Sequence, residues 1–304
     1  MTLAQLLPRY LRHLTAERNA SPYTVRNYGT DLASFQKFLD QTGTPLEMVE
    51  RTTLRGYLSW LMEGDFSRRS IARKLSALRS FYRYLLREGI VASNPTATTT
   101  SPKIEKRLPE FLSVEEARRL VEAPDTSTPW GQRDRALLEL LYASGLRVSE
   151  VAGLDLDRVD LESRQLRVWG KGSKERMVLM GKPAAAALET YLRESRPRLR
   201  GKEKADALFI SRYGKRLVPR RVQYMVDDYA RKIGLAKRIH PHMIRHTFAT
   251  HLLDGSADLR VVQELLGHAQ LSSTEVYTHV TQSKARKVYM AAHPGAKEQK
   301  EEAL

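Results

Sequence analysis

The sequence predicts a mainly α-helical protein with a small antiparallel β-sheet in its second half. Apolar residues recur at three-to-four spacing along most of the chain, which is the period of helices packed on a core. Strand-like alternation is confined to residues 159–180, where two glycines separate the apolar runs. The length of 304 residues suggests about two domains at roughly 150 residues each.

Residues 1–92 show only helical patterns and are expected to form a small helical bundle. Its first helix is expected over residues 3–14, and Gly89 is expected to end its last one. The other helices begin at hydroxyl side chains that can cap a helix. These starts are Ser21, Thr52 or Thr53, and Ser67 or Ser70.

The last helix of this bundle has a basic face. Few acidic residues stand four positions from these basic residues, so ion pairs along the helix do not explain them. We expect phosphate contacts, which position a protein on DNA without reading its sequence. A solvated face is the alternative. The residues are Arg68, Arg69, Arg73, Lys74 and Arg79.

Residues 93–110 are expected to link two domains, because prolines and a polar run interrupt regular structure there. The linker is basic, so it could follow a DNA backbone between the two halves of a clamp; a plain tether is the alternative. Its basic residues are Lys103, Lys106 and Arg107.

Residues 111–294 are expected to form an α+β domain, followed by a loose, mixed-charge tail at 295–304. Ser113 and Glu116 form a capping box, and Gly145 ends a later helix. A hairpin is expected near Lys171 to Lys174. The expected helices are 113–120, 132–143, 183–199 and 219–233, with a short strand at 208–210.

Composition favours a polyanionic partner. There are 51 Lys+Arg against 35 Asp+Glu, which gives a net charge of +16 and a pI near 10.0. Cys is absent, so disulfides and thiolate chemistry are excluded. The sequence shows no signal peptide and no long apolar run, so we expect a cytoplasmic protein and no membrane partner.

Reactive side chains gather between His240 and Tyr277. In a helix that begins at Pro241, His242 and Arg245 share one face. Gly267 is expected to end the next helix and to place His268 at a turn. Ser272 and Glu275 then form a capping box that puts Tyr277 about one turn into a further helix. Two imidazoles, a guanidinium and a phenol at helix ends suit a phosphodiester substrate.

The histidines of this stretch raise a zinc hydrolase as an alternative. Zinc sites usually need three or four converging ligands. The cation of Arg245 disfavours a nearby metal, and no carboxylate follows until Asp254. We therefore expect no metal site, and we expect structural roles for His246 and His251.

Four motifs together resemble the tyrosine recombinases, also called the phage integrase family. His242-x-x-Arg245 is followed by Leu266-Gly267-His268 and, nine residues later, by Tyr277. Upstream, 144–150 resembles the segment with the family's first arginine, and 170–176 resembles its lysine-bearing hairpin. The resemblance covers nearly the whole chain and is closest to the Xer branch. It implies a SAM-like core-binding domain over 1–92 and a recombinase catalytic domain after it.

The resemblance also implies the reaction. Tyr277 would attack a DNA phosphate and form a 3′-phosphotyrosyl intermediate, which conserves the bond energy, so no cofactor is expected. Guanidinium groups bind phosphate oxygens in a planar fork. The resemblance implies that Arg147 and Arg245 bind the phosphate and that Glu150 orients Arg147. Lys171 would protonate the leaving group, with Lys174 as the alternative. His242 and His268 would contact the phosphate and handle protons.

The implied partners are double-stranded DNA with a specific recombination site and a homo- or heterotetramer on two such sites, with a DNA translocase as a possible activator. The expected role is chromosome dimer resolution through a Holliday junction. The bundle begins almost at Met1, which favours the Xer branch over a mobile-element integrase. A type IB topoisomerase and a non-catalytic DNA-binding protein are further alternatives.

By resemblance, the 283–292 helix should pack on a neighbouring subunit; packing within the chain is the alternative. The residues of its apolar face are Ala285, Val288, Tyr289 and Ala292.

Overall fold

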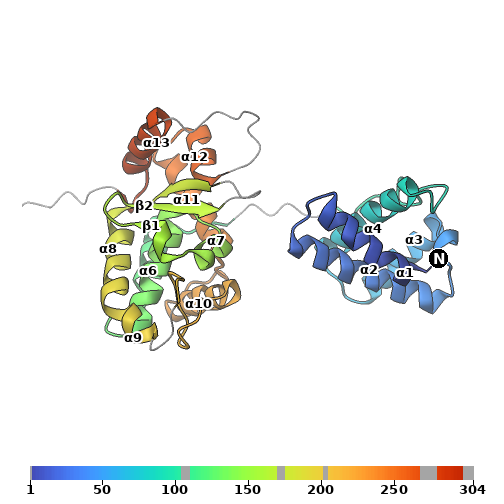
Figure 1. Cartoon of the computed structure of the whole chain (residues 1–304), viewed down its shortest axis with the longest axis horizontal. Coiled ribbons are helices and arrows are strands. Elements are labelled where there is room, and N and C mark those ends of the chain that lie inside the picture. The colour runs from blue at the N-terminus through green and yellow to red at the C-terminus, as the bar shows by residue number, and fades with distance from the viewer. Residues whose placement is uncertain (1, 104–109, 170–174, 201–204, 268–278, 297–304) are drawn as a thin grey trace, which may run out of the picture. The chain divides into compact units, whose positions relative to one another are not determined.

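A computed structural model describes residues 2–103, 110–169, 175–200, 205–267 and 279–296 (Figure 1). The chain divides into two compact units, residues 1–107 and 108–304. The border between the units falls inside the segment predicted as a linker. In the described residues, no helix is long and apolar enough to cross a membrane.

Unit 1 is a helical bundle, as predicted. Its elements are α1 (Leu3–Ala16), α2 (Pro22–Thr42), a 3-10 helix (Leu46–Met48), α3 (Arg51–Glu63) and α4 (Arg68–Arg87). The Ser21 and Ser67 hydroxyls cap α2 and α4 by accepting from the backbone N–H three residues on. The start predicted for α3 at Thr52 or Thr53 is displaced, because Glu50 is the residue before the helix and its N–H donates to Thr53 Oγ1 at 3.3 Å.

The core of unit 1 is rich in aromatic side chains. Tyr10 packs edge-on against Phe81 with ring centroids 5.1 Å apart, and Phe35 packs in the same way against Tyr57 at 4.9 Å. All four rings are fully buried. Such pairs contribute about 0.5–1.5 kcal/mol beyond the burial of their area. Unit 1 therefore has a hydrophobic core of its own.

Unit 2 surrounds one buried helix with further helices and a small sheet, in agreement with the predicted α+β class. Helix α6 (Pro129–Ser144) is buried along almost its whole length, and it contacts α5, α8 and α11. The other elements are α5 (Val114–Glu122), α7 (Val148–Gly153), a 3-10 helix (Leu156–Arg158), β1 (Val159–Asp160), β2 (Gln165–Trp169), β3 (Glu175–Leu179), α8 (Lys182–Thr190), a π-helical segment (Tyr191–Ser195), α9 (Arg196–Arg200), α10 (Pro219–Lys232), α11 (Pro241–Asp254), α12 (Leu259–Leu266) and α13 (His279–Ala292).

The sheet is antiparallel in the order β1-β2-β3, as predicted. Leu166 and Val168 on β2 are buried and lie opposite Val178 and Arg176 on β3. Directly opposite residues of an antiparallel pair point to the same face. Arg176 therefore shares the core face of the sheet with apolar side chains.

The strand predicted at 208–210 does not join this sheet. Ala207 and Ile210 form only isolated bridges, to Asp155 and Arg216. The apolar run is real, since Leu208 and Phe209 are buried in the core of unit 2. Burial of these side chains thus explains the apolar pattern that predicted a strand. Among the described residues, the run forms only single bridges to residues outside the three-stranded sheet.

Helix α13 packs on its own unit, so the expected docking of its apolar face on a neighbouring subunit is wrong for this structure. Tyr289 is buried, and its hydroxyl donates to the Ala143 carbonyl at 2.9 Å. Ala285 and Ala292 are buried as well. The backbone of Gly255 lies so close to α13 that an added Cβ would stand 2.3 Å from the Ala292 oxygen. The alternative of packing within the chain is therefore the correct one here.

Candidate active site

The site is built where α6 ends against α11. Gly145 ends α6 in the left-handed conformation with φ of 58°, as predicted. An added Cβ at this residue would lie 2.4 Å from Cδ1 of Phe248 on α11. Glycine thus allows both the turn and the close approach of the two helices. Leu146 is then buried, and Arg147 follows at the start of α7.

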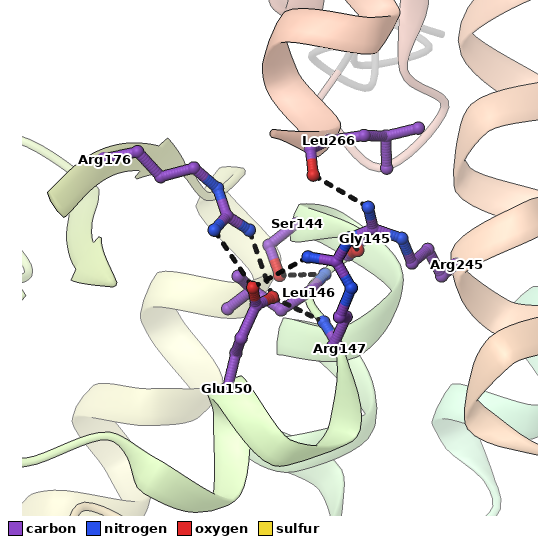
Figure 2. A network of polar contacts seen from close by, with 8 residues as sticks. All are labelled: Ser144, Gly145, Leu146, Arg147, Glu150, Arg176, Arg245 and Leu266. Atoms are coloured by element: carbon purple, nitrogen blue, oxygen red, sulfur yellow. Dashed lines mark hydrogen bonds and ion pairs between the residues drawn. The ribbon is translucent and has the colours of Figure 1, made fainter. Parts of the chain in front are cut away.

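Glu150 holds Arg147 by two hydrogen bonds. The Arg147 amide donates to Oε2 at 2.8 Å, and its Nη1 donates to Oε1 at 3.0 Å (Figure 2). The Arg147 side chain remains 41% exposed, whereas that of Glu150 is 9% exposed. Among the described residues, the other guanidinium nitrogens of Arg147 have no acceptor. An oriented guanidinium with spare donors can bind an anion.

Arg176 binds the same carboxylate from the sheet, and sequence reasoning missed this residue. Its Nη1 and Nη2 donate to Oε1 and Oε2 of Glu150, both at 3.0 Å. Burial, the largest influence, raises the pKa of Glu150, but the hydrogen bonds from Arg176 and from the Arg147 amide outweigh it and hold that pKa below its ordinary value. The alternating pattern places Arg176 on the inward face of the sheet, but the sequence does not show that Glu150 is its partner there.

Arg245 joins the site from α11. Its Nη1 donates to the Gly145 carbonyl at 2.6 Å, and its Nη2 donates to the Leu266 carbonyl at 2.7 Å, so it connects the ends of α6 and α12 (Figure 2). Burial, with a contribution from the nearby charge of Arg147, lowers the pKa of Arg245 to about 10. The group is still protonated at neutral pH. Around Glu150, three guanidinium groups thus gather near a single carboxylate (Figure 2).

His242 lies on α11 three residues before Arg245, as predicted, and is exposed. His240 precedes the helix and caps it, since its Nδ1 accepts from the Met243 amide at 3.1 Å. The two imidazole rings are 6.3 Å apart between centroids. His242 is therefore the exposed histidine of α11, three positions before Arg245 on the same helix.

Two further histidines have the structural surroundings expected for them. His251 is buried, with Nε2 2.9 Å from the Leu112 carbonyl and Nδ1 2.9 Å from the Tyr142 hydroxyl. Burial lowers the pKa of His251, which keeps it neutral. His246 packs edge-on against Phe111. The described residues contain no group of three or more His, Asp or Glu that could hold a metal ion.

The structure thus brings Arg147, Glu150 and Arg245 together and adds Arg176 to them. Six other residues predicted for the site or for DNA contact lie outside the described residues, and their roles remain predictions. These are Lys106, Arg107, Lys171, Lys174, His268 and Tyr277.

Only some of the basic side chains predicted to contact DNA from α4 are exposed and unpaired among the described residues. Arg68 and Arg69 are exposed, and so is Lys103 beyond the helix. Arg79 is half-buried and donates to Ser101 Oγ at 2.9 Å, which attaches α4 to the segment after it. Arg73 is exposed but forms an ion pair with the buried carboxylate of Asp31.

Lys74 corrects the prediction. Its side chain is 5% exposed, and its Nζ lies 3.5 Å from Asp31 Oδ1 and 4.9 Å from the centre of the Phe66 ring. An ammonium group so placed faces the interior of unit 1 and cannot contact a phosphate without leaving it. The spacing of charges along α4 could not predict this ion pair, because its acidic partner Asp31 belongs to α2.

Comparisons with known proteins agree along the whole chain. The model of the phage integrase family matches residues 110–284, and that of the phage integrase N-terminal SAM-like domain matches 7–89. The tyrosine recombinase XerC of Pelotomaculum thermopropionicum is 47% identical over 302 residues, 96% of this chain and 98% of the relative. That of Myxococcus xanthus is 44% identical over 299 residues, 97% of this chain and 99% of the relative.

Solved structures show the same likeness. The XerA recombinase is 31% identical with a TM-score of 0.50, over 96% of this chain and 99% of that one. The XerH site-specific recombinase, in a post-cleavage complex with a palindromic difH substrate, is 26% identical with a TM-score of 0.69, over 90% of this chain and 81% of that one.

The fold, the family models and the similar recombinases define an enzyme that cleaves and rejoins DNA strands. The chain belongs to the phage integrase family, and within it to the site-specific tyrosine recombinases.

Proposed function

We propose that this recombinase resolves chromosome dimers by exchanging DNA strands between two copies of a specific site. The observation that supports this most is the arrangement of Arg147 and Arg245, which two separate helices hold beside each other. Charge builds on the phosphate oxygens as a phosphodiester is attacked, and pre-oriented cations stabilise it. Similarity to XerC proteins over nearly the whole chain supports the chromosomal role.

In the proposed reaction, Tyr277 gives its phenolic proton to His242 or His268 as its oxygen bonds to the phosphorus, and the bond to the 5′-oxygen breaks as that oxygen takes a proton from Lys171. Among the described residues, Arg147 has unused guanidinium donors, and Arg245 retains three of its five N–H groups after donating to two carbonyls. Both can therefore bind non-bridging oxygens. The 5′-hydroxyl of a partner strand then attacks the 3′-phosphotyrosine and gives its proton back to Lys171, while Tyr277 leaves and regains its own proton. Exchange of both strand pairs passes through a Holliday junction. His242 and His268 also donate hydrogen bonds to the scissile phosphate.

The proposed assembly is a homo- or heterotetramer on two DNA sites, in the cytoplasm, with a DNA translocase as a possible activator. The similar XerH recombinase is bound to its difH substrate in the solved complex, which supports double-stranded DNA as the partner here. Domain limits of 1–92, 93–110, 111–294 and 295–304 are part of the proposal. No cofactor enters it.

The test begins by finding the site. Covalent complexes trapped on nicked genomic fragments should carry one short chromosomal sequence. Two copies of that sequence on a supercoiled plasmid should then yield smaller circles. Relaxation without smaller circles would instead identify a topoisomerase, and a trapped site inside a mobile element would identify an integrase.

The exposed arginines of α4 are expected to contact phosphate, and the buried lysine is not. Arg69→Ala should reduce the slope of log K against log salt by about 0.9, the value for one lost phosphate contact. Lys74→Met is the matched control on the same helix. It should leave the slope unchanged and lower the melting temperature, since it removes a buried charge beside Asp31. Equal slopes for wild type and Arg69→Ala, measured by fluorescence anisotropy, would remove α4 from the interface.

A further inference from the structure

Arg176 is a charged residue in an apolar position. It lies opposite buried Val168 on the core face of the sheet, and its side chain is 11% exposed. Removing a guanidinium from water is costly unless hydrogen bonds compensate for it. The proposed reaction gives this residue no task, so its burial calls for an explanation.

Glu150 supplies the compensation, and it serves Arg147 at the same time. Arg176 takes both carboxylate oxygens in a planar fork, whereas the Arg147 guanidinium has one bond, to Oε1. Without Arg176, the carboxylate of Glu150 would be left with Arg147 as its cationic partner among the described residues. A carboxylate that is 9% exposed would then draw the Arg147 guanidinium into a fork of its own.

Arg176 also touches the end of α12. An added Cβ at Gly267 would lie 2.8 Å from Arg176 Nε and 2.9 Å from its Cδ. Gly267 has a φ of 67°, and the carbonyl just before it, that of Leu266, accepts from Arg245. Arg245 therefore bonds to the last turn of α12 and the Arg176 side chain packs close to its end. The predicted catalytic residue His268 is next in the chain.

We propose that Arg176 is a positioning residue for DNA cleavage. By occupying both oxygens of Glu150, it leaves the donors of Arg147 available to the scissile phosphate, and it fixes the end of α12 relative to them. This inference rests on the proposed role of Arg147. A purely structural attachment of β3 to α7 would involve the same contacts, so the test must separate stability from rate.

Arg176→Lys retains the charge but cannot form the fork, because a lysine presents one nitrogen. Arg176→Met retains the apolar stem only. Arg196→Lys is the matched control, since Arg196 is also an arginine largely removed from water in unit 2. It donates to the carbonyls of Ala207 and Leu208, which belong to no part of the site. Single-turnover cleavage of a nicked DNA site, DNA affinity and thermal unfolding are measured for each variant below its melting temperature.

We expect cleavage at saturating DNA to fall about 10- to 100-fold in Arg176→Lys and further in Arg176→Met, because small misplacement of catalytic groups has effects of that order. DNA affinity should change less than about 2-fold, since only the contact of Arg147 with the scissile phosphate is altered and the many other phosphate contacts dominate affinity. Arg196→Lys should lose stability and retain its cleavage rate at saturating DNA. A normal rate in Arg176→Met, or an equal loss in Arg196→Lys, overturns the inference.

A double-mutant cycle tests whether Arg176 acts through Glu150. Residues that act as a unit give strongly non-additive effects. The variant with both Glu150→Gln and Arg176→Met should cleave no more slowly than the slower single variant. If the two losses multiply, Arg176 does not act through Glu150 and the inference fails. This outcome can be told apart from failure of the proposed recombinase function, because in that case the wild-type protein itself would form no covalent complex with DNA.

Discussion

Tyr277→Phe should abolish the covalent protein–DNA complex and leave DNA affinity unchanged. The substitution keeps the ring and removes the only atom that can bond to phosphorus. An isolated tyrosine has a pKa of about 10, so the nucleophile depends on nearby positive charge to react at neutral pH. Arg147 and Arg245 are the described groups that can supply this charge. Covalent adducts are counted on denaturing gels, and affinity is measured by anisotropy.

Tyr289→Phe is the matched control, chosen because 13 tyrosines occur and most are expected to be packing residues. Its hydroxyl donates to the Ala143 carbonyl inside unit 2. Removing this hydrogen bond should lower stability by about 1–3 kcal/mol, because a buried carbonyl loses its partner, and cleavage should continue. Cleavage should also persist in EDTA. An adduct from Tyr277→Phe, or loss of activity in EDTA, would refute the assignment.

Lys171→Ala should slow cleavage about 10²- to 10⁴-fold with little loss of binding. The 5′-oxygen leaves as an alcohol, and a positioned acid contributes a factor of about that size. At about 1.36 kcal/mol for each tenfold change, the effect is roughly 3–5 kcal/mol of barrier. The rate of single-turnover cleavage measures it, with DNA at saturation.

A substrate with sulfur at the 5′ bridging position separates acid catalysis from charge stabilisation. A thiolate leaves without a proton, so Lys171→Ala should approach the wild-type rate on this DNA. Arg147→Ala and Arg245→Ala should remain slow, because charge still builds on the non-bridging oxygens. Rescue of Lys174→Ala alone would make Lys174 the acid. If neither lysine variant is rescued, His242 or His268 is the next candidate.

Much of the fold could be predicted because its determinants are local. The caps of α2, α4 and α5 depend on a serine and on backbone donors within three residues of it. The C-terminal ends at Gly145 and Gly267 depend on the positive φ of one residue. Such signals lie within one turn of sequence, so a single sequence is sufficient to identify them.

Apart from the start of α3, the errors concern contacts between distant segments. The pattern along α4 predicts a surface position for Lys74 because Asp31 is on another helix, and the apolar run 208–210 predicts a strand because burial and pairing leave the same pattern. Of the candidate site, Arg147, Glu150 and Arg245 could be named from motifs. Arg176 could not, because its importance depends on meeting Glu150, which is 26 residues away.

The hydrogen bond from Arg245 to Gly145 also limits the order in which the folded parts of the protein can form during synthesis. The Gly145 carbonyl that it binds is 100 residues earlier in the chain. At about 5–20 residues per second, a ribosome takes on the order of 5–20 s to cover that separation. Unit 1, with its separate core, can fold well before then. A growing chain can therefore fold unit 1 before Arg245 reaches the Gly145 carbonyl, so the arginine cluster of the candidate site forms only after unit 1 is complete.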